Sequence, residues 1–199
     1  MVRKIFSGIA AGIMIAIGGS VFLSCDTKWV GAILFSVALL TICYQGYALF
    51  TGKIGFIPEK HDKEAVSVLL LGLLGNFIAT VVLGLTLRYA VPNIGTAAEA
   101  ACAARMEQAL PQTLIRAIFC GILMYTAVSI YRDHKTITGI LFCIPVFILS
   151  GFEHSIADMF YFAAAGMISG HVILFILIVL IGNAIGGMLF PILLPKKGN

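Results

Sequence analysis

Three ionisable side chains lie close together in an otherwise apolar stretch of this chain: Glu153, His154 and Asp158. Such groups are costly in hydrocarbon, so they usually face a bundle interior or an aqueous path and mark where a polar solute crosses. Histidine is the side chain best suited to give and recover a proton at physiological pH. The stretch therefore predicts the centre of a pore for a small anion.

The composition places these residues in a membrane. Of 199 residues, 60% are hydrophobic and 11% are charged, and the mean hydropathy is +1.06. A soluble domain has about a quarter of its residues charged. Runs of about 20 apolar residues are long enough to span a bilayer, and they occur at roughly 5–24, 29–50, 65–90, 112–131, 137–165 and 171–194. We therefore expect an all-α membrane protein with six transmembrane helices in one transport domain, residues 1–199.

Lysine and arginine residues stand at the ends of these runs, which fits membrane topology better than nucleic-acid binding. With the N-terminus inside, Lys28, Arg88 and Arg105 lie outside, Arg116 lies at a helix mouth, and the cytoplasmic side carries Arg3, Lys4, Lys53, Lys60, Lys63, Arg132, Lys135, Lys196 and Lys197. We expect a multi-pass protein of the inner membrane with both termini cytoplasmic. Phe22-Leu23-Ser24-Cys25 faintly resembles a lipoprotein cleavage site, but the full spanning length of the run favours a helix.

Short sequence matches recur in the same order in the two halves of the chain. Arg3-Lys-Ile-Phe-Ser-Gly8 is matched by Arg116-Ala-Ile-Phe-Cys-Gly121, and Leu74-Gly75-Asn76 by Ile181-Gly182-Asn183. Three spans per half require the second half to start on the opposite side of the membrane. The pattern predicts an inverted repeat, with one unit at about 1–90, the other at about 112–195, and a boundary loop around 91–111.

Each half carries a point at which its second helix is expected to break. Thr51 and Gly52 end the apolar run of span two, and Gly151-Phe152-Glu153-His154-Ser155 interrupts span five. Non-helical backbone at membrane depth needs protein or water to satisfy its polar groups. The two breaks should therefore face each other, which brings Thr51 towards His154.

Several of these segments resemble the formate/nitrite transporter family over nearly the whole chain. The resemblance rests on Ser150-Gly-Phe-Glu-His-Ser-Ile-Ala-Asp-Met-Phe160, Leu49-Phe-Thr-Gly52, Gly75-Asn-Phe-Ile78 and Ile181-Gly-Asn-Ala-Ile-Gly-Gly187. It implies an aquaporin-like bundle of six helices with broken helices two and five, assembled as a homopentamer with one pore per protomer. It also implies transport of small monovalent anions, such as formate, nitrite or hydrosulfide, together with protons.

The same resemblance implies roles for particular residues. His154 corresponds to the central pore histidine and Thr51 to its hydroxyl neighbour. Apart from the resemblance, Glu153 is either a buried hydrogen-bonding support that orients the backbone or a direct participant, and we expect the support role. The apolar constrictions correspond to Phe35, Leu39, Leu49, Phe50 and Phe147. On spacing alone, these five residues are ordinary core.

Three positions depart from the family pattern. Arg105 replaces a usual lysine, Gly121 replaces a usual asparagine, and Asp158 stands where asparagine is common. We expect Arg105 to draw anions into the outer vestibule by its charge. These departures leave the natural anion open, along with the direction of flux.

Other classes of membrane protein fit less well. A haem protein needs paired histidines on facing helices, and His171 lies at the start of a span. In Glu153-His154-Ser155 the residues are consecutive, so their side chains do not converge as in a hydrolase. The remaining alternative is an aquaporin-like channel for small neutral solutes, but the two Asn-Pro-Ala motifs expected by that resemblance are missing. We expect no enzyme activity and no cofactor, and we interpret the scattered cysteines as small core residues without metal or disulfide spacing: Cys25, Cys43, Cys102, Cys120 and Cys143.

Overall fold

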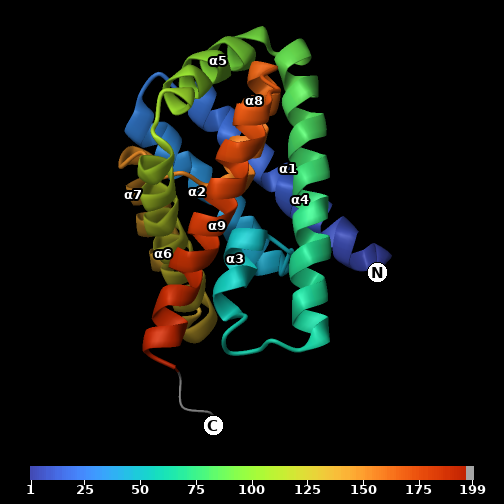
Figure 1. Ribbon diagram of the computed structural model, residues 1–199, viewed down its shortest axis with the longest axis vertical. Helices are drawn as coiled ribbons and strands as arrows, with labels where there is room; N and C mark the ends of the chain where they lie inside the picture. The colour runs from blue at the N-terminus through green and yellow to red at the C-terminus, as the bar shows by residue number, and fades with distance from the viewer. Residues whose placement is uncertain (196–199) are drawn as a thin grey trace.

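The computed structural model describes residues 1–195, which fold into a bundle of helices (Figure 1). Two of the sequence-predicted cytoplasmic cations, Lys196 and Lys197, lie outside the described residues. The helices are α1 (Val2–Ser24), α2 (Lys28–Gln45), α3 (Phe50–Lys53), the short 3-10 helix η1 (Ile54–Phe56), α4 (Lys63–Ala90), α5 (Pro92–Met106), α6 (Leu110–His134), α7 (Thr138–Leu149), α8 (Ser155–Ala165) and α9 (Gly170–Leu193).

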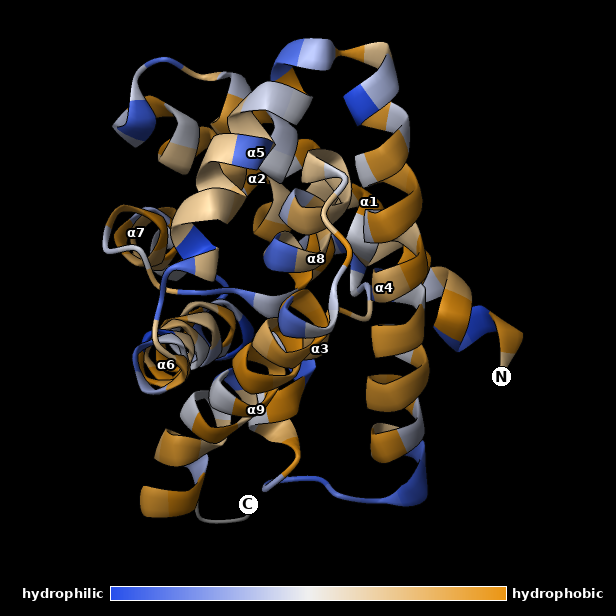
Figure 2. Cartoon of the chain, turned by 45° about the horizontal axis from the view of Figure 1, so that its top comes forward, coloured by the Kyte–Doolittle hydropathy of each residue, from blue (hydrophilic) through white to orange (hydrophobic). Residues whose placement is uncertain are grey.

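Five of the described helices are long and apolar enough to cross a membrane: α1, α2, α4, α6 and α9. Large apolar side chains remain exposed on the outer faces of the bundle, as the orange flanks of α4 in Figure 2 illustrate. They include Phe6, Leu70, Phe77, Phe142 and Ile181. A soluble monomer rarely exposes so much contiguous apolar surface. The protein is therefore a multi-pass membrane protein.

Two of the expected spans contain non-helical residues, but the break expected at Thr51-Gly52 was wrong in position, because both residues belong to α3. Residues 46–49 separate α2 from α3, and residues 150–154 separate α7 from α8. Each stretch includes a glycine in the left-handed region, Gly46 at φ 71° and Gly151 at φ 68°. A residue with a Cβ is strained in that conformation. Glycine therefore allows the chain to leave the helix at both points.

The expected loop at 91–111 was wrong for most of its length, because residues 92–106 form α5. Pro92 occupies the first turn, where its missing N–H costs nothing and its fixed φ suits a helix. The helix lies across the top of the bundle in Figure 1 and packs against α8 and α4. Arg105, in its last turn, therefore has a defined position over the N-terminal part of α8.

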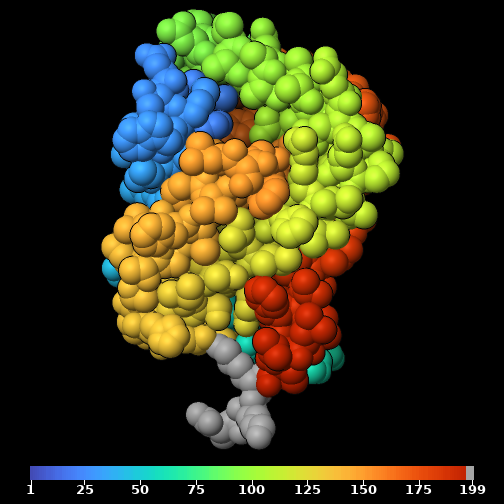
Figure 3. Space-filling view, turned by 90° about the vertical axis from the view of Figure 1, so that its left-hand side faces the viewer, coloured from blue at the N-terminus to red at the C-terminus, as the bar shows by residue number. Residues whose placement is uncertain are grey.

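The helices pair in a similar way in the two halves of the chain. α1 packs along α4 and α6 packs along α9, while α2 packs on α1 and α7 on α6. Figure 3 shows α7, α6 and α9 side by side on one face.

Gly121 lies where α6 packs closely on α9. A Cβ at Gly121 would clash with the carbonyl oxygen of Asn183. The departure at Gly121 therefore has a packing reason, since a side chain there would push α6 away from α9.

Candidate functional site

Thr51 and His154 lie in contact at the centre of the bundle. The Thr51 hydroxyl oxygen and His154 Nε2 are 2.8 Å apart. Thr51 belongs to α3 and is 1% exposed, while His154 precedes α8 and is 2% exposed. The predicted proximity of Thr51 and His154 is confirmed, although Thr51 itself lies within α3 and not at a break.

The hydrogen bonds of His154 define its tautomer. Its Nδ1 accepts the backbone N–H of Ala157 at 3.1 Å, which makes His154 the N-cap of α8. A backbone N–H can only donate, so Nδ1 carries no hydrogen and the neutral ring has its hydrogen on Nε2. Nε2–H then donates to the Thr51 oxygen. The Thr51 hydroxyl hydrogen is left to donate to a bound solute.

Two asparagines hold the non-helical stretches by equivalent hydrogen bonds. Asn76 accepts the Phe50 N–H at 2.9 Å and donates to the Gly8 and Ala48 carbonyls at 2.8 and 3.0 Å. The break leaves the Phe50 N–H and the Ala48 carbonyl without helical partners, and the asparagine satisfies both while its third bond, to the Gly8 carbonyl, ties the break to α1.

The second asparagine, Asn183, repeats this arrangement in the other half of the chain. It accepts the Ser155 N–H and donates to the Ala117 and Glu153 carbonyls, all at 2.9 Å. From the sequence, Asn76 and Asn183 are visible only as markers of a repeat, although their position after a glycine in both halves is the signal of their role.

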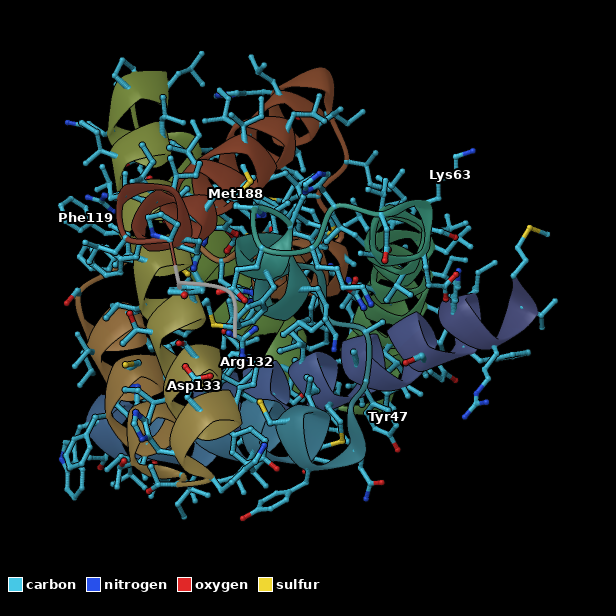
Figure 4. The ribbon with its side chains drawn as sticks, turned by 90° about the horizontal axis from the view of Figure 1, so that it is seen from below. Tyr47, Lys63, Phe119, Arg132, Asp133 and Met188 are labelled. Atoms are coloured by element: carbon cyan, nitrogen blue, oxygen red, sulfur yellow. The ribbon has the colours of Figure 1, made fainter. Side chains whose placement is uncertain are left out.

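Apolar side chains lie on either side of the pair. The Phe147 ring stacks on the His154 ring with centroids 5.7 Å apart, and Phe35 meets Phe147 edge-on at 6.3 Å. Leu39 and Leu49 line a cavity of about 330 Å³ that also borders Lys53, Arg132 and Lys135. Phe50 is buried at the start of α3. Figure 4 shows Tyr47 and Arg132, which line the same cavity, from this end of the bundle.

Arg105 contacts two buried carboxyl groups. Its Nε donates to Glu153 Oε2 at 3.0 Å and to Asp158 Oδ1 at 3.1 Å, and its guanidinium lies 5.1 Å from the centre of the Tyr161 ring. Gln108, in the turn after α5, donates to the other Glu153 oxygen at 2.7 Å. No sequence signal identified Gln108, because nothing in the chain predicted that this turn packs against Glu153.

Glu153 therefore faces α5, on the other side of the chain from the Thr51 contact of His154. Its backbone carbonyl is bonded to Asn183 and its carboxylate to Arg105 and Gln108. This geometry agrees with the expectation that Glu153 supports the backbone. It does not place Arg105 as an unpaired cation at the mouth of a pore.

Comparison with known proteins identifies the family. A model of the family described as "Formate/nitrite transporter" matches residues 1–196. The chain belongs to the formate/nitrite transporter family.

Within this family, a curated relative is the "Uncharacterized transporter YwcJ" of Bacillus subtilis (strain 168). It is 27% identical over 191 residues, covering 84% of this chain and 75% of that protein. Two solved structures share the fold. A "Pentameric formate channel with formate bound" has 23% identity and a TM-score of 0.77, covering 96% of this chain and 94% of its own. An "FNT family ion channel" has 21% identity and a TM-score of 0.73, covering 95% and 85%.

Proposed function

We propose that this protein is a membrane channel for the small monovalent anions of weak acids, with formate, nitrite and hydrosulfide as candidates. The observation that carries the proposal is the buried Thr51–His154 hydrogen bond between apolar side chains. It leaves the Thr51 hydroxyl hydrogen to donate to a small solute in otherwise apolar surroundings. Membership of the formate/nitrite transporter family supports the same solute class.

The cost of desolvation decides the form in which the solute crosses. A bare anion between apolar constrictions pays tens of kcal/mol in the idealised limit, whereas a neutral acid pays only a polar-transfer cost. The anion therefore becomes a stronger base as it leaves water. It takes up a proton while Thr51 donates a hydrogen bond to it, and it crosses as the neutral acid.

The proton comes from hydronium in the aqueous phase, which becomes water, and not from a histidinium ion. Charging His154 would place a hydrogen on Nδ1, where it would face the N–H of Ala157 and break the N-cap of α8. The neutral ring keeps Nε2–H as a donor and polarises the Thr51 hydroxyl. Neutralisation thus takes place at His154 without a permanent charge on its ring.

The two apolar constrictions lie on opposite sides of this pair. Phe35 and Phe147 form one, next to the His154 ring. Leu39 and Leu49, with Phe50 at the start of α3, form the other, at the inner end of the cavity that Lys53, Arg132 and Lys135 border. Each constriction excludes hydrated ions and passes the neutral acid.

Topology and assembly belong to the same proposal. The chain forms an inverted repeat of six spans, counting α7 with α8, with both termini on the cytoplasmic side of the inner membrane. Lys4 pairs with Glu64 at 2.6 Å, which sets the start of α1 beside the start of α4.

We propose a homopentamer with a pore in each protomer, by analogy with the solved pentameric formate channel. Light scattering of the purified protein in mild detergent tests the number of chains.

The flux of formate, nitrite, hydrosulfide and glycerol into proteoliposomes tests the solute class. We expect at least one of the three anions to pass well above the rate of empty liposomes, and glycerol to remain at background. The alternative of an aquaporin-like channel for neutral solutes predicts the reverse order. Glycerol flux with no anion flux would therefore overturn the proposal.

A further inference from the structure

The cluster formed by Arg105, Glu153 and Asp158, called the Arg105 cluster below, has an unbalanced set of charges. The side chain of Glu153 is 3% exposed and that of Asp158 is 1% exposed. Both accept from the same guanidinium N–H. With both carboxyl groups ionised, the cluster would carry a net charge of −1 in a buried site.

Among the described residues, Arg105 is the one cation that pairs with either carboxyl group. The groups nearest the cluster are Cys102 on α5, Cys120 on α6 and Tyr161 on α8. Thiols and phenols are neutral at neutral pH.

Two other cations lie near the ends of this region: Arg116 on α6 is exposed beside Gly151, and Arg88 on α4 donates to the Ala164 carbonyl and pairs with Glu99. In the described part of the chain, neither has a hydrogen bond to Glu153 or Asp158. A buried, uncompensated carboxylate is strongly destabilising.

The hydrogen bonds distinguish the two carboxyl groups. Both oxygens of Glu153 receive a donor, one from Arg105 and one from Gln108. Asp158 receives one donor, on Oδ1, while its Oδ2 is buried without a hydrogen-bond partner among the described residues. Donors stabilise an ionised carboxylate, and an ionised oxygen without a donor pays the full cost of desolvation. Asp158 Oδ2 is therefore the position at which a proton costs least.

We propose that the Arg105 cluster binds one proton at neutral pH, on Asp158, so that Arg105 and Glu153 form an ion pair beside a neutral carboxylic acid. The cluster then has no net charge. Arg105 acts as a positioning residue that fixes Glu153 and the first turn of α8 next to His154. A neutral cluster does not attract anions from a distance, so the sequence-based role of Arg105 in the vestibule is replaced.

Infrared spectroscopy of the purified parent protein, in a detergent without ester or carboxyl groups, tests this proposal without any transport measurement. A carboxylic acid has a carbonyl stretch that is separate from the amide and carboxylate bands and shifts in D₂O. We expect this band at neutral pH in the parent and its loss in Asp158→Asn, an isosteric change that keeps a neutral group. Asp26→Asn, at an exposed position, is the matched control and should keep the band.

The infrared bands of the parent and the variants decide whether Asp158 carries the proton. No protonated-carboxyl band in the parent at neutral pH would overturn the proposal, as would a band that persists in Asp158→Asn and disappears in Glu153→Gln. Titration of the parent alone covers the case in which a variant fails to fold. The band should then be lost only at alkaline pH, whereas loss near the ordinary titration range of aspartate would contradict the proposal. None of these results depends on which solute the channel carries.

Discussion

Replacing His154 by asparagine or by phenylalanine should reduce weak-acid flux by about 10- to 100-fold, because each variant loses the Nε2–H···Thr51 hydrogen bond. Without Nε2–H, the Thr51 hydroxyl hydrogen is no longer directed at the anion, and a hydrogen bond to a charged group is worth about 1.5–3 kcal/mol, which corresponds to this range. Asparagine is a good N-cap, so it retains the bond to Ala157. Phenylalanine keeps a ring that can stack on Phe147. Flux into proteoliposomes measures the effect.

The two variants together separate chemistry from folding. A loss of flux in both cannot be due to the missing cap, which asparagine supplies, or to the missing ring, which phenylalanine supplies. His171→Asn, at an exposed histidine at the start of α9, is the control and should transport like the parent. Parent-like flux in both His154 variants, with normal assembly, would leave His154 a structural residue.

Replacing Asn183 by alanine should destabilise the protein more than any exposed substitution. The side chain satisfies three buried backbone groups, the Ser155 N–H and the carbonyls of Ala117 and Glu153. Each unsatisfied buried group costs about 1–3 kcal/mol. Ala117 lies inside α6 and its carbonyl keeps a helical partner, so two groups lose their only partner, at about 2–6 kcal/mol in total. This loss is comparable with the marginal stability of an ordinary domain, about 5–15 kcal/mol. We expect a large fall in thermal unfolding temperature in detergent, or little folded protein.

Asn183→Asp sharpens this test, because aspartate has nearly the same shape but cannot donate to the two carbonyls. It should be destabilising as well. Asn93→Ala, at an exposed position in α5, should leave the unfolding temperature unchanged. If Asn183→Ala and Asn183→Asp unfold at the parent temperature, the asparagine does not hold the stretch that contains His154.

The contact between Thr51 and His154 could be predicted from the sequence because two interruptions of apolar runs, in two similar halves, must meet. The hydrogen bonds that hold the backbone around this contact could be predicted only in part. Asn76 and Asn183 were visible as repeat markers, but the partners of their side chains depend on where the backbone leaves the helix. That point lies at 46–49 in the first half, earlier than Thr51-Gly52 suggested. Gly46 was the signal that marked it.

The role of Arg105 could not be read from its position in the chain. As a charged residue in an expected loop, it was typical of a solvated cation. The loop instead forms α5, which brings Arg105 and Gln108 over α8 and against Glu153. Pro92 and the alanine-rich stretch that follows favour a helix locally, but no local pattern indicates which side chains that helix covers.

The pH dependence of formate flux, measured beside chloride in the same proteoliposomes, tests the central claim most directly. Formate and chloride carry the same charge, but only formate becomes a neutral acid in the accessible pH range. If a solute is neutralised at the Thr51–His154 pair, formate flux rises as the pH falls and chloride flux stays near that of empty liposomes. Chloride flux equal to that of formate, or formate flux independent of pH, would contradict the account.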